Sequence, residues 1–254
     1  LISLIWLLVF WAGLSSLWSH NYNLSVAYWF RIVEAIILIL IILNLNLNFH
    51  KLSYALVISG VLQSLLSVEQ FLTQQILANK YLGMALHLPL ETTASVIEIG
   101  SQRWLRAYGS FSHPNILGGF LALSLVTAVY LYFNNSVGRR KIFNLSAVLI
   151  IFTGLFFSFS RSAWMATFFA GLPLLYFYGL KKYFRTTIKL LLYLGVLVLV
   201  LVFIYNSLIF TRLSFNQRLE IRSVDRRIES IVEAKEIIRD HWLSGVGLGN
   251  YTDY

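Results

Sequence analysis

Seven long runs of mostly apolar residues divide this chain, and they limit its fold more than any other feature. A helix needs roughly 20 such residues to cross a bilayer. The runs lie at about 1–19, 27–48, 52–76, 114–133, 143–160, 163–180 and 188–210. Only 12% of the residues are charged, whereas soluble domains carry about 25%. The sequence therefore predicts an all-α polytopic membrane protein with about seven transmembrane helices.

The third run differs from the others because polar side chains fill its second half. These are Gln63, Glu69, Gln70, Gln74 and Gln75. We expect this helix to leave the membrane near Glu69 and to continue along the interface.

The cations predict the orientation of the helices. The formal net charge is +9, and Lys and Arg concentrate in the short loops 134–142 and 181–189, with Lys51 near a third turn. Such loops face the cytoplasm, so membrane topology explains the basic charge and a nucleic-acid partner is not needed. The predicted division is a bundle at 1–210, with an outer loop at 78–113, and the start of a large extracytoplasmic loop at 211–254.

The predicted outer segment contains an amphipathic helix. Apolar residues recur every three or four positions between Arg218 and Arg239, which is the helical period. The run GVGLGN, 245–250, follows a helix rather than a strand, so it predicts a flexible turn and not a nucleotide-binding loop.

Three arginines on the predicted outer face are candidates for binding an anion. Arg103, Arg106 and Arg161 lie in or near a stretch without any Asp or Glu from Ile99 to Leu219. Guanidinium groups bind phosphate through paired hydrogen bonds. Two alternatives stay open, because Arg161 could simply reach water from the interface, and Glu91, Glu98 or the tail could fold back to neutralise the arginines.

Other polar residues have simpler interpretations. In SFSHPN, 110–115, Ser112 or His113 would cap a helix that starts with Pro114. Arg31 and Glu34 are three residues apart on a predicted membrane helix and could form an ion pair, or part of an ion path. The chain has no cysteine and no histidine pair at metal-ligand spacing, so no metal site is expected.

Three segments in order resemble the O-antigen ligase and polymerase family. They are RAYGSFSHPNILGGFLAL at 106–123, FSFSRSAWMA at 157–166 and RRIESIVEAKEIIRDHWLSGVGLGNY at 226–251. The resemblance covers about residues 100–254, and before that it rests on hydropathy.

The resemblance implies a multi-pass protein of the bacterial inner membrane that acts without metal or cofactor. It would move a glycan from undecaprenyl pyrophosphate to an acceptor on the outer face, either a lipid A core, a protein or another lipid-linked repeat. Arg106 and Arg161 match the family's pyrophosphate-binding arginines, Arg103 would assist, and His113 or Asn115 would contact the glycan. Ligase and polymerase activities both fit.

The family's proposed base is a histidine in a later part of the outer loop. His241 does not match its context, so no catalytic residue is expected here, and the histidine would follow Tyr254 in a longer protein. Two other functions fit the pattern less well: transport of a small anion such as bicarbonate, and a non-catalytic part in envelope assembly.

Overall fold

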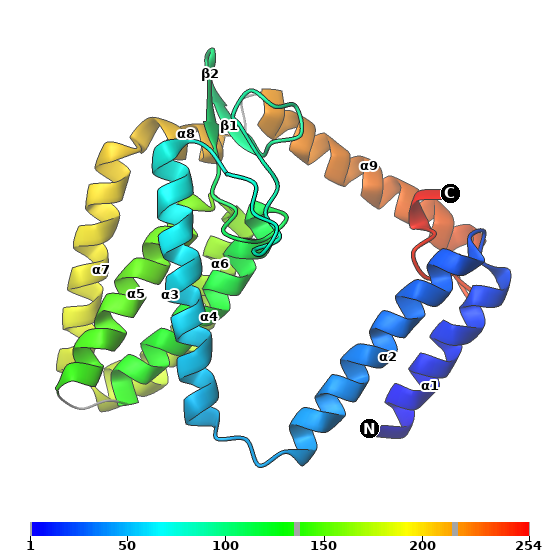
Figure 1. Cartoon of the computed structure of the whole chain (residues 1–254), viewed down its shortest axis with the longest axis horizontal. Helices are drawn as coiled ribbons and strands as arrows, with labels where there is room; N and C mark the ends of the chain where they lie inside the picture. Colours follow the sequence, from blue (N-terminus) through cyan, green and yellow to red (C-terminus); the bar gives the residue numbers. More distant parts are fainter. Residues whose placement is uncertain (1, 135–137, 215–217, 254) are drawn as a thin grey trace. The chain divides into compact units, whose positions relative to one another are not determined.

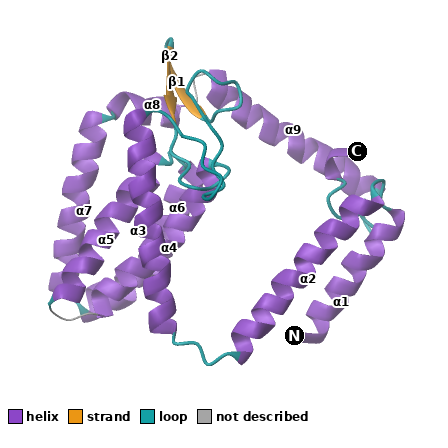
Figure 2. Ribbon diagram, in the orientation of Figure 1, coloured by secondary structure: helices purple, strands orange, loops and turns teal. Residues whose placement is uncertain are grey.

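The computed structural model describes residues 2–134, 138–214 and 218–253, and almost all its regular structure is helical (Figures 1 and 2). The helices are α1 Ile2–Leu14, α2 Tyr22–Asn44, α3 Phe49–Thr73, α4 Pro114–Asn134, α5 Arg139–Phe157, α6 Arg161–Leu174, α7 Phe184–Ile204, α8 Asn206–Ser214 and α9 Arg218–Asp240. The fold also contains three short helical turns, η1 Ser15–Trp18, η2 Leu175–Leu180 and η3 Tyr251–Asp253. Two strands, β1 Val96–Ile99 and β2 Gln102–Leu105, form an antiparallel pair.

Six helices are long and apolar enough to cross a membrane, and this confirms the all-α membrane fold. They are α2, α3, α4, α5, the continuous segment Arg161–Leu180 and α7. The first predicted span is shorter than expected, since the apolar helix there covers only Leu4–Trp18. Helix α3 runs unbroken from Phe49 to Thr73, so the expected change near Glu69 does not interrupt it.

The chain forms two compact units, residues 1–47 with 222–254 and residues 48–221. The predicted division at residue 210 concerns membrane topology, which these units do not test, and it stays a prediction. The tail is grouped with the first two helices because it packs against them, whereas α3 to α8 share one core.

The larger unit is held by aromatic stacking and by close approach of its helices. Phe71 of α3 stacks on Phe157 with ring centroids 4.2 Å apart. A Cβ atom on Gly154 would lie 2.6 Å from the Cβ of Ser64, so α3 and α5 touch through small side chains. Small residues let membrane helices approach in this way, and the outer loop is built on this rigid base.

The smaller unit holds the glycine-rich run in place. Asn250 is completely buried; its Oδ1 accepts from the Asn21 amide at 2.7 Å, and its Nδ2 donates to Ser25 Oγ at 3.2 Å. Ser25 Oγ donates in turn to the Leu248 carbonyl at 2.8 Å. The run predicted to be a flexible turn is therefore anchored on the α1–α2 hairpin, while the predicted amphipathic helix is confirmed as α9.

Candidate functional site

Glutamines within α3 and directly after its last residue hold the outer loop of the larger unit. Gln70 Oε1 accepts from the backbone amides of Tyr108 and Gly109 at 3.0 and 2.9 Å, and its Nε2 donates to the Gly109 carbonyl at 2.8 Å. Gln74 Oε1 accepts from the Leu105 amide at 2.7 Å, and Gln63 Oε1 from the Ser110 amide at 2.9 Å. These glutamines fix residues 105–110, which carry Arg106.

Arg106 is buried, with 4% of its surface exposed. Its Nε donates to the Ser158 carbonyl at 2.8 Å, Nη1 to Ser95 Oγ at 2.8 Å and Nη2 to Asn115 Oδ1 at 2.7 Å. One guanidinium thereby joins the outer loop, the start of α4 and the turn that follows α5. In this structure Arg106 therefore positions these three segments relative to one another.

The turn between α5 and α6 is strained. Phe159 is fully buried and has φ +46°, a conformation that is unfavourable for any residue but glycine. Such strain costs about 1–3 kcal/mol and persists only when surrounding contacts impose it. Here Arg106 binds the preceding carbonyl, of Ser158, and Arg212 Nε donates to the Phe159 carbonyl at 3.0 Å. Two cations therefore impose the shape of this turn.

Arg161 begins α6 directly after that turn. Ser160 caps the helix, since its Oγ accepts from the Ala163 amide at 3.4 Å. Arg161 Nη1 donates to the Arg212 carbonyl at 2.9 Å, and the side chain is partly exposed. Arg106, Arg161 and Arg212, which we call the arginine cluster, are thus linked through residues 158–161 at the end of the bundle that carries β1, β2 and α8 (Figure 1).

The start of α4 borders this cluster. His113 Nδ1 accepts from the Asn115 amide at 3.1 Å, which confirms the predicted cap. Loss of hydration first, and then the charges of Arg106 and Arg212, lower the pKa of His113 below its ordinary value. The imidazole is therefore neutral at neutral pH, as a ring nitrogen that accepts a hydrogen bond requires.

Arg103 lies on β2 and belongs to a different group. Its Nε is 3.5 Å from Glu98 Oε1, and Arg218 Nη2 lies 3.0 Å from the same oxygen. Glu98 thus folds back to neutralise Arg103, one of the alternatives left open by the sequence. Two arginines share this carboxylate, so it also fastens the beginning of α9 to the β1–β2 pair.

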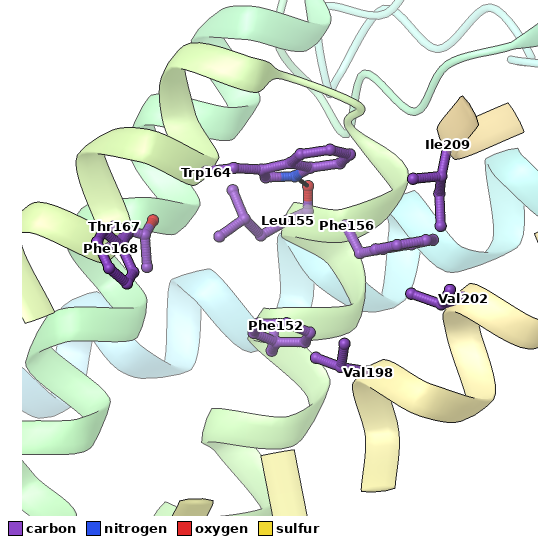
Figure 3. Close-up of a pocket in the computed structure, with 9 residues that line it drawn as sticks. All are labelled: Phe152, Leu155, Phe156, Trp164, Thr167, Phe168, Val198, Val202 and Ile209. Atoms are coloured by element: carbon purple, nitrogen blue, oxygen red, sulfur yellow. Dashed lines mark hydrogen bonds between the residues drawn. The ribbon is translucent and has the colours of Figure 1, made fainter. Parts of the chain in front are cut away.

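An apolar pocket of about 350 Å³ lies beside the strained turn. Figure 3 shows Phe156 and Trp164 above Phe152, with Val198, Val202 and Ile209 on the facing helices. Trp164 Nε1 donates to the Leu155 carbonyl at 3.1 Å, the dashed line in Figure 3. Residues on both sides of the turn line the pocket, and Ile209 is three residues before Arg212. A ligand with a hydrocarbon chain in the pocket could therefore place an attached anionic group near the arginine cluster.

Sequence reasoning missed Arg212 and the function of the glutamines. Gln63 and Gln70 are seven residues apart, so they share one face of α3, and that spacing could have indicated an inward polar stripe. No comparable signal identifies Arg212, whose partners come from distant segments. The predicted pair of Arg31 and Glu34 is not formed among the described residues, and Arg31 lies over the Tyr28 ring, 5.1 Å from its centroid.

Comparisons with known proteins agree with the motifs. Residues 145–254 match the family model described as O-Antigen ligase, a range that includes Arg161, Arg212, α9 and the anchored glycine run. No curated protein and no solved structure matches the chain. The segment 106–123 lies before the matched range, so its similarity rests on its sequence. The chain is thus a multi-pass membrane protein whose residues 145–254 are similar to the O-antigen ligase family, the family that its motifs resemble.

Proposed function

We propose that this protein transfers a glycan from undecaprenyl pyrophosphate to an acceptor on the outer face of the bacterial inner membrane. The acceptor is a lipid A core, a protein or a second lipid-linked repeat. The observation that supports this most is the convergence of Arg106, Arg161 and Arg212 on one strained turn at the predicted outer end of the bundle.

The chemistry of this transfer needs such a cluster. Breaking the bond between the sugar and the phosphate leaves a lipid pyrophosphate whose negative charge grows in the transition state. Fixed cations stabilise that charge without having to reorganise. Arg161 is partly exposed and is assigned the direct phosphate contact. The buried Arg106 keeps the turn in shape and adds positive potential, as does Arg212.

The donor's isoprenoid chain has a matching surface. The apolar pocket of Figure 3 is lined by Phe152, Phe156 and Trp164 together with aliphatic residues of α7 and α8. It borders the arginine cluster through Leu155, Phe156 and Ile209. Burial of apolar groups contributes about 25 cal/mol per Å², so a prenyl segment would bind here while its pyrophosphate reaches Arg161. Arg103, paired with Glu98, is assigned a supporting role.

The test is glycan transfer by the complete protein in reconstituted membranes. Arg161→Ala removes the direct contact and should lower the rate about 30- to 1000-fold, which corresponds to roughly 2–4 kcal/mol. Arg161→Lys keeps the charge but loses the paired geometry, so its rate should lie between the two. Arg239→Ala is a matched control, because that arginine's side chain is 87% exposed.

Thermal stability in detergent should change little in all three variants. Transfer at the wild-type rate by Arg161→Ala would show that this arginine only anchors the turn at the interface.

A further inference from the structure

A second cavity, of about 220 Å³, lies within the outer loop of the larger unit. Its lining includes Ala85 and His87 on one side and Tyr108, Phe111 and Ser112 on the other. The proposed donor chemistry uses none of these residues. Unlike the pocket of Figure 3, this cavity combines aromatic rings with polar side chains.

Both walls of this cavity are held in place. The first is a hairpin in which Ile76 and His87 exchange backbone hydrogen bonds of 3.0 Å and Asn79 pairs with Met84 at 2.9 Å. The second wall carries Tyr108 and Gly109, whose amides bind Gln70. A cavity with fixed walls loses little conformational entropy when it binds a ligand.

The groups that line the cavity indicate the class of ligand. The His87 ring stacks on Tyr108 with centroids 4.8 Å apart, and Phe111 packs on Phe120 at 5.2 Å. Ser112 is exposed and forms no hydrogen bond within the part of the chain that is described. His87 Nδ1 is buried and has no hydrogen-bond partner among the described residues, and it lies 3.7 Å from Glu91 Oε2.

This combination favours a carbohydrate. Sugar rings have apolar C–H faces that pack on aromatic side chains, and hydroxyls that pair with groups such as a serine hydroxyl or an imidazole nitrogen. None of the described residues that line the cavity is a lysine or an arginine, which disfavours a phosphate. The polar groups equally disfavour an alkyl chain, which would leave them buried and unpaired.

The cavity lies next to the arginine cluster. Ser112 directly precedes His113, whose pKa is lowered in part by Arg106 and Arg212. The rings of Tyr108 and His113 are 6.4 Å apart. The cavity and the arginine cluster therefore both adjoin His113, which suits a sugar joined to a phosphate.

We propose that this cavity binds a sugar residue of the lipid-linked glycan, close to the pyrophosphate. The inference rests on the proposed function and extends it, because it assigns a glycan subsite to the outer loop. Two probes separate the two ideas: the native lipid-linked glycan extracted from the source cells, and undecaprenyl pyrophosphate without sugar.

The experiment measures the affinity of the complete protein in nanodiscs for both probes. The wild type should bind the glycan form more tightly. Ala85 is exposed at the rim, so Ala85→Trp fills the cavity from outside and should remove this preference while binding of the bare carrier stays unchanged. Ser112→Ala deletes one hydrogen bond and should weaken only glycan binding, by roughly 3- to 10-fold.

Leu90→Trp is the matched control, since Leu90 is 83% exposed on the same loop and does not line the cavity; it should behave as the wild type. Equal affinity of the wild type for both probes, or an unchanged preference in both Ala85→Trp and Ser112→Ala, overturns the sugar site and leaves the transferase proposal intact. A wild type that binds neither probe overturns the transferase proposal, and the sugar site with it.

Discussion

Replacing Gln70 by methionine tests how far α3 controls the shape of the outer loop. The two side chains have similar length, and Gln70 is 2% exposed, so packing is largely kept while its three hydrogen bonds to the loop backbone are lost. Two backbone amides and one carbonyl, of Tyr108 and Gly109, then lose their partners. A buried polar group without a partner costs about 1–3 kcal/mol.

For three such groups the total free-energy cost is about 3–9 kcal/mol. The low end of this range applies because water can enter an outer loop and pair with the exposed groups. About 3 kcal/mol corresponds to roughly a hundredfold change in a local opening equilibrium. Hydrogen exchange followed by mass spectrometry should show this at Arg106 and Ala107. Their own amides keep their acceptors, Ser95 and Phe157, so faster exchange there reports loosening of the whole segment.

Gln75→Met is the control, because Gln75 is exposed just beyond the end of α3 and should leave exchange unchanged. The loosened loop would also release the hold of Arg106 on the turn at 158–161, and glycan transfer should fall with it. Unchanged exchange at Arg106 and Ala107 in Gln70→Met would refute the view that the glutamines hold the loop.

Three further predictions concern topology, packing and protonation. In this cysteine-free chain, an impermeant maleimide should label Leu90→Cys on intact cells and Lys182→Cys only after permeabilisation; labelling of both from one side contradicts the topology. Gly118→Ala should lower the free energy of unfolding by about 1–3 kcal/mol, because its Cβ would lie 2.9 Å from the Cβ of a residue on α6. Gly119→Ala has open space around it and should be neutral or slightly stabilising. Melting curves of the two variants, measured side by side, check this difference. The lowered pKa of His113 means that the unfolded chain binds more protons than the folded one. The contribution of His113 to stability is therefore complete above the ordinary pKa of 6.5 and falls as the pH drops below that value. His113→Asn should reduce this fall, and a melting temperature with the same pH dependence in the variant as in the wild type would contradict the prediction.

Hydropathy and charge predicted the membrane fold because they act locally, within one helix or one short loop. The six candidate spans lie close to six of the predicted runs. The length of the first run, at about 1–19, was overestimated, since hydropathy alone does not detect the early end of α1 at Leu14. Likewise, the cap at His113 and the helix over 218–240 follow from short-range patterns.

The candidate site was only partly predictable because its contacts join distant segments. The motif around Arg161 indicated a turn, but the strain at Phe159 and its restraint by Arg212, 53 residues later, cannot be inferred from spacing. The absence of Asp and Glu from Ile99 to Leu219 suggested that three arginines have no carboxylate nearby. It could not show that Glu98, just outside that gap, pairs with Arg103.

The glutamine contacts also have a consequence for how this protein is made. Gln70 binds residues 38 and 39 positions later in the chain, across a loop that the predicted topology places outside the membrane. The ribosome must release the whole loop, and the translocation machinery must pass it across, before these hydrogen bonds can form. Until then the glutamine side chains of α3 lack these partners, which is costly for any that lie within the membrane. Insertion of α3 and α4 as a pair avoids that state, so the polar stripe favours biogenesis by helical hairpins rather than by single helices.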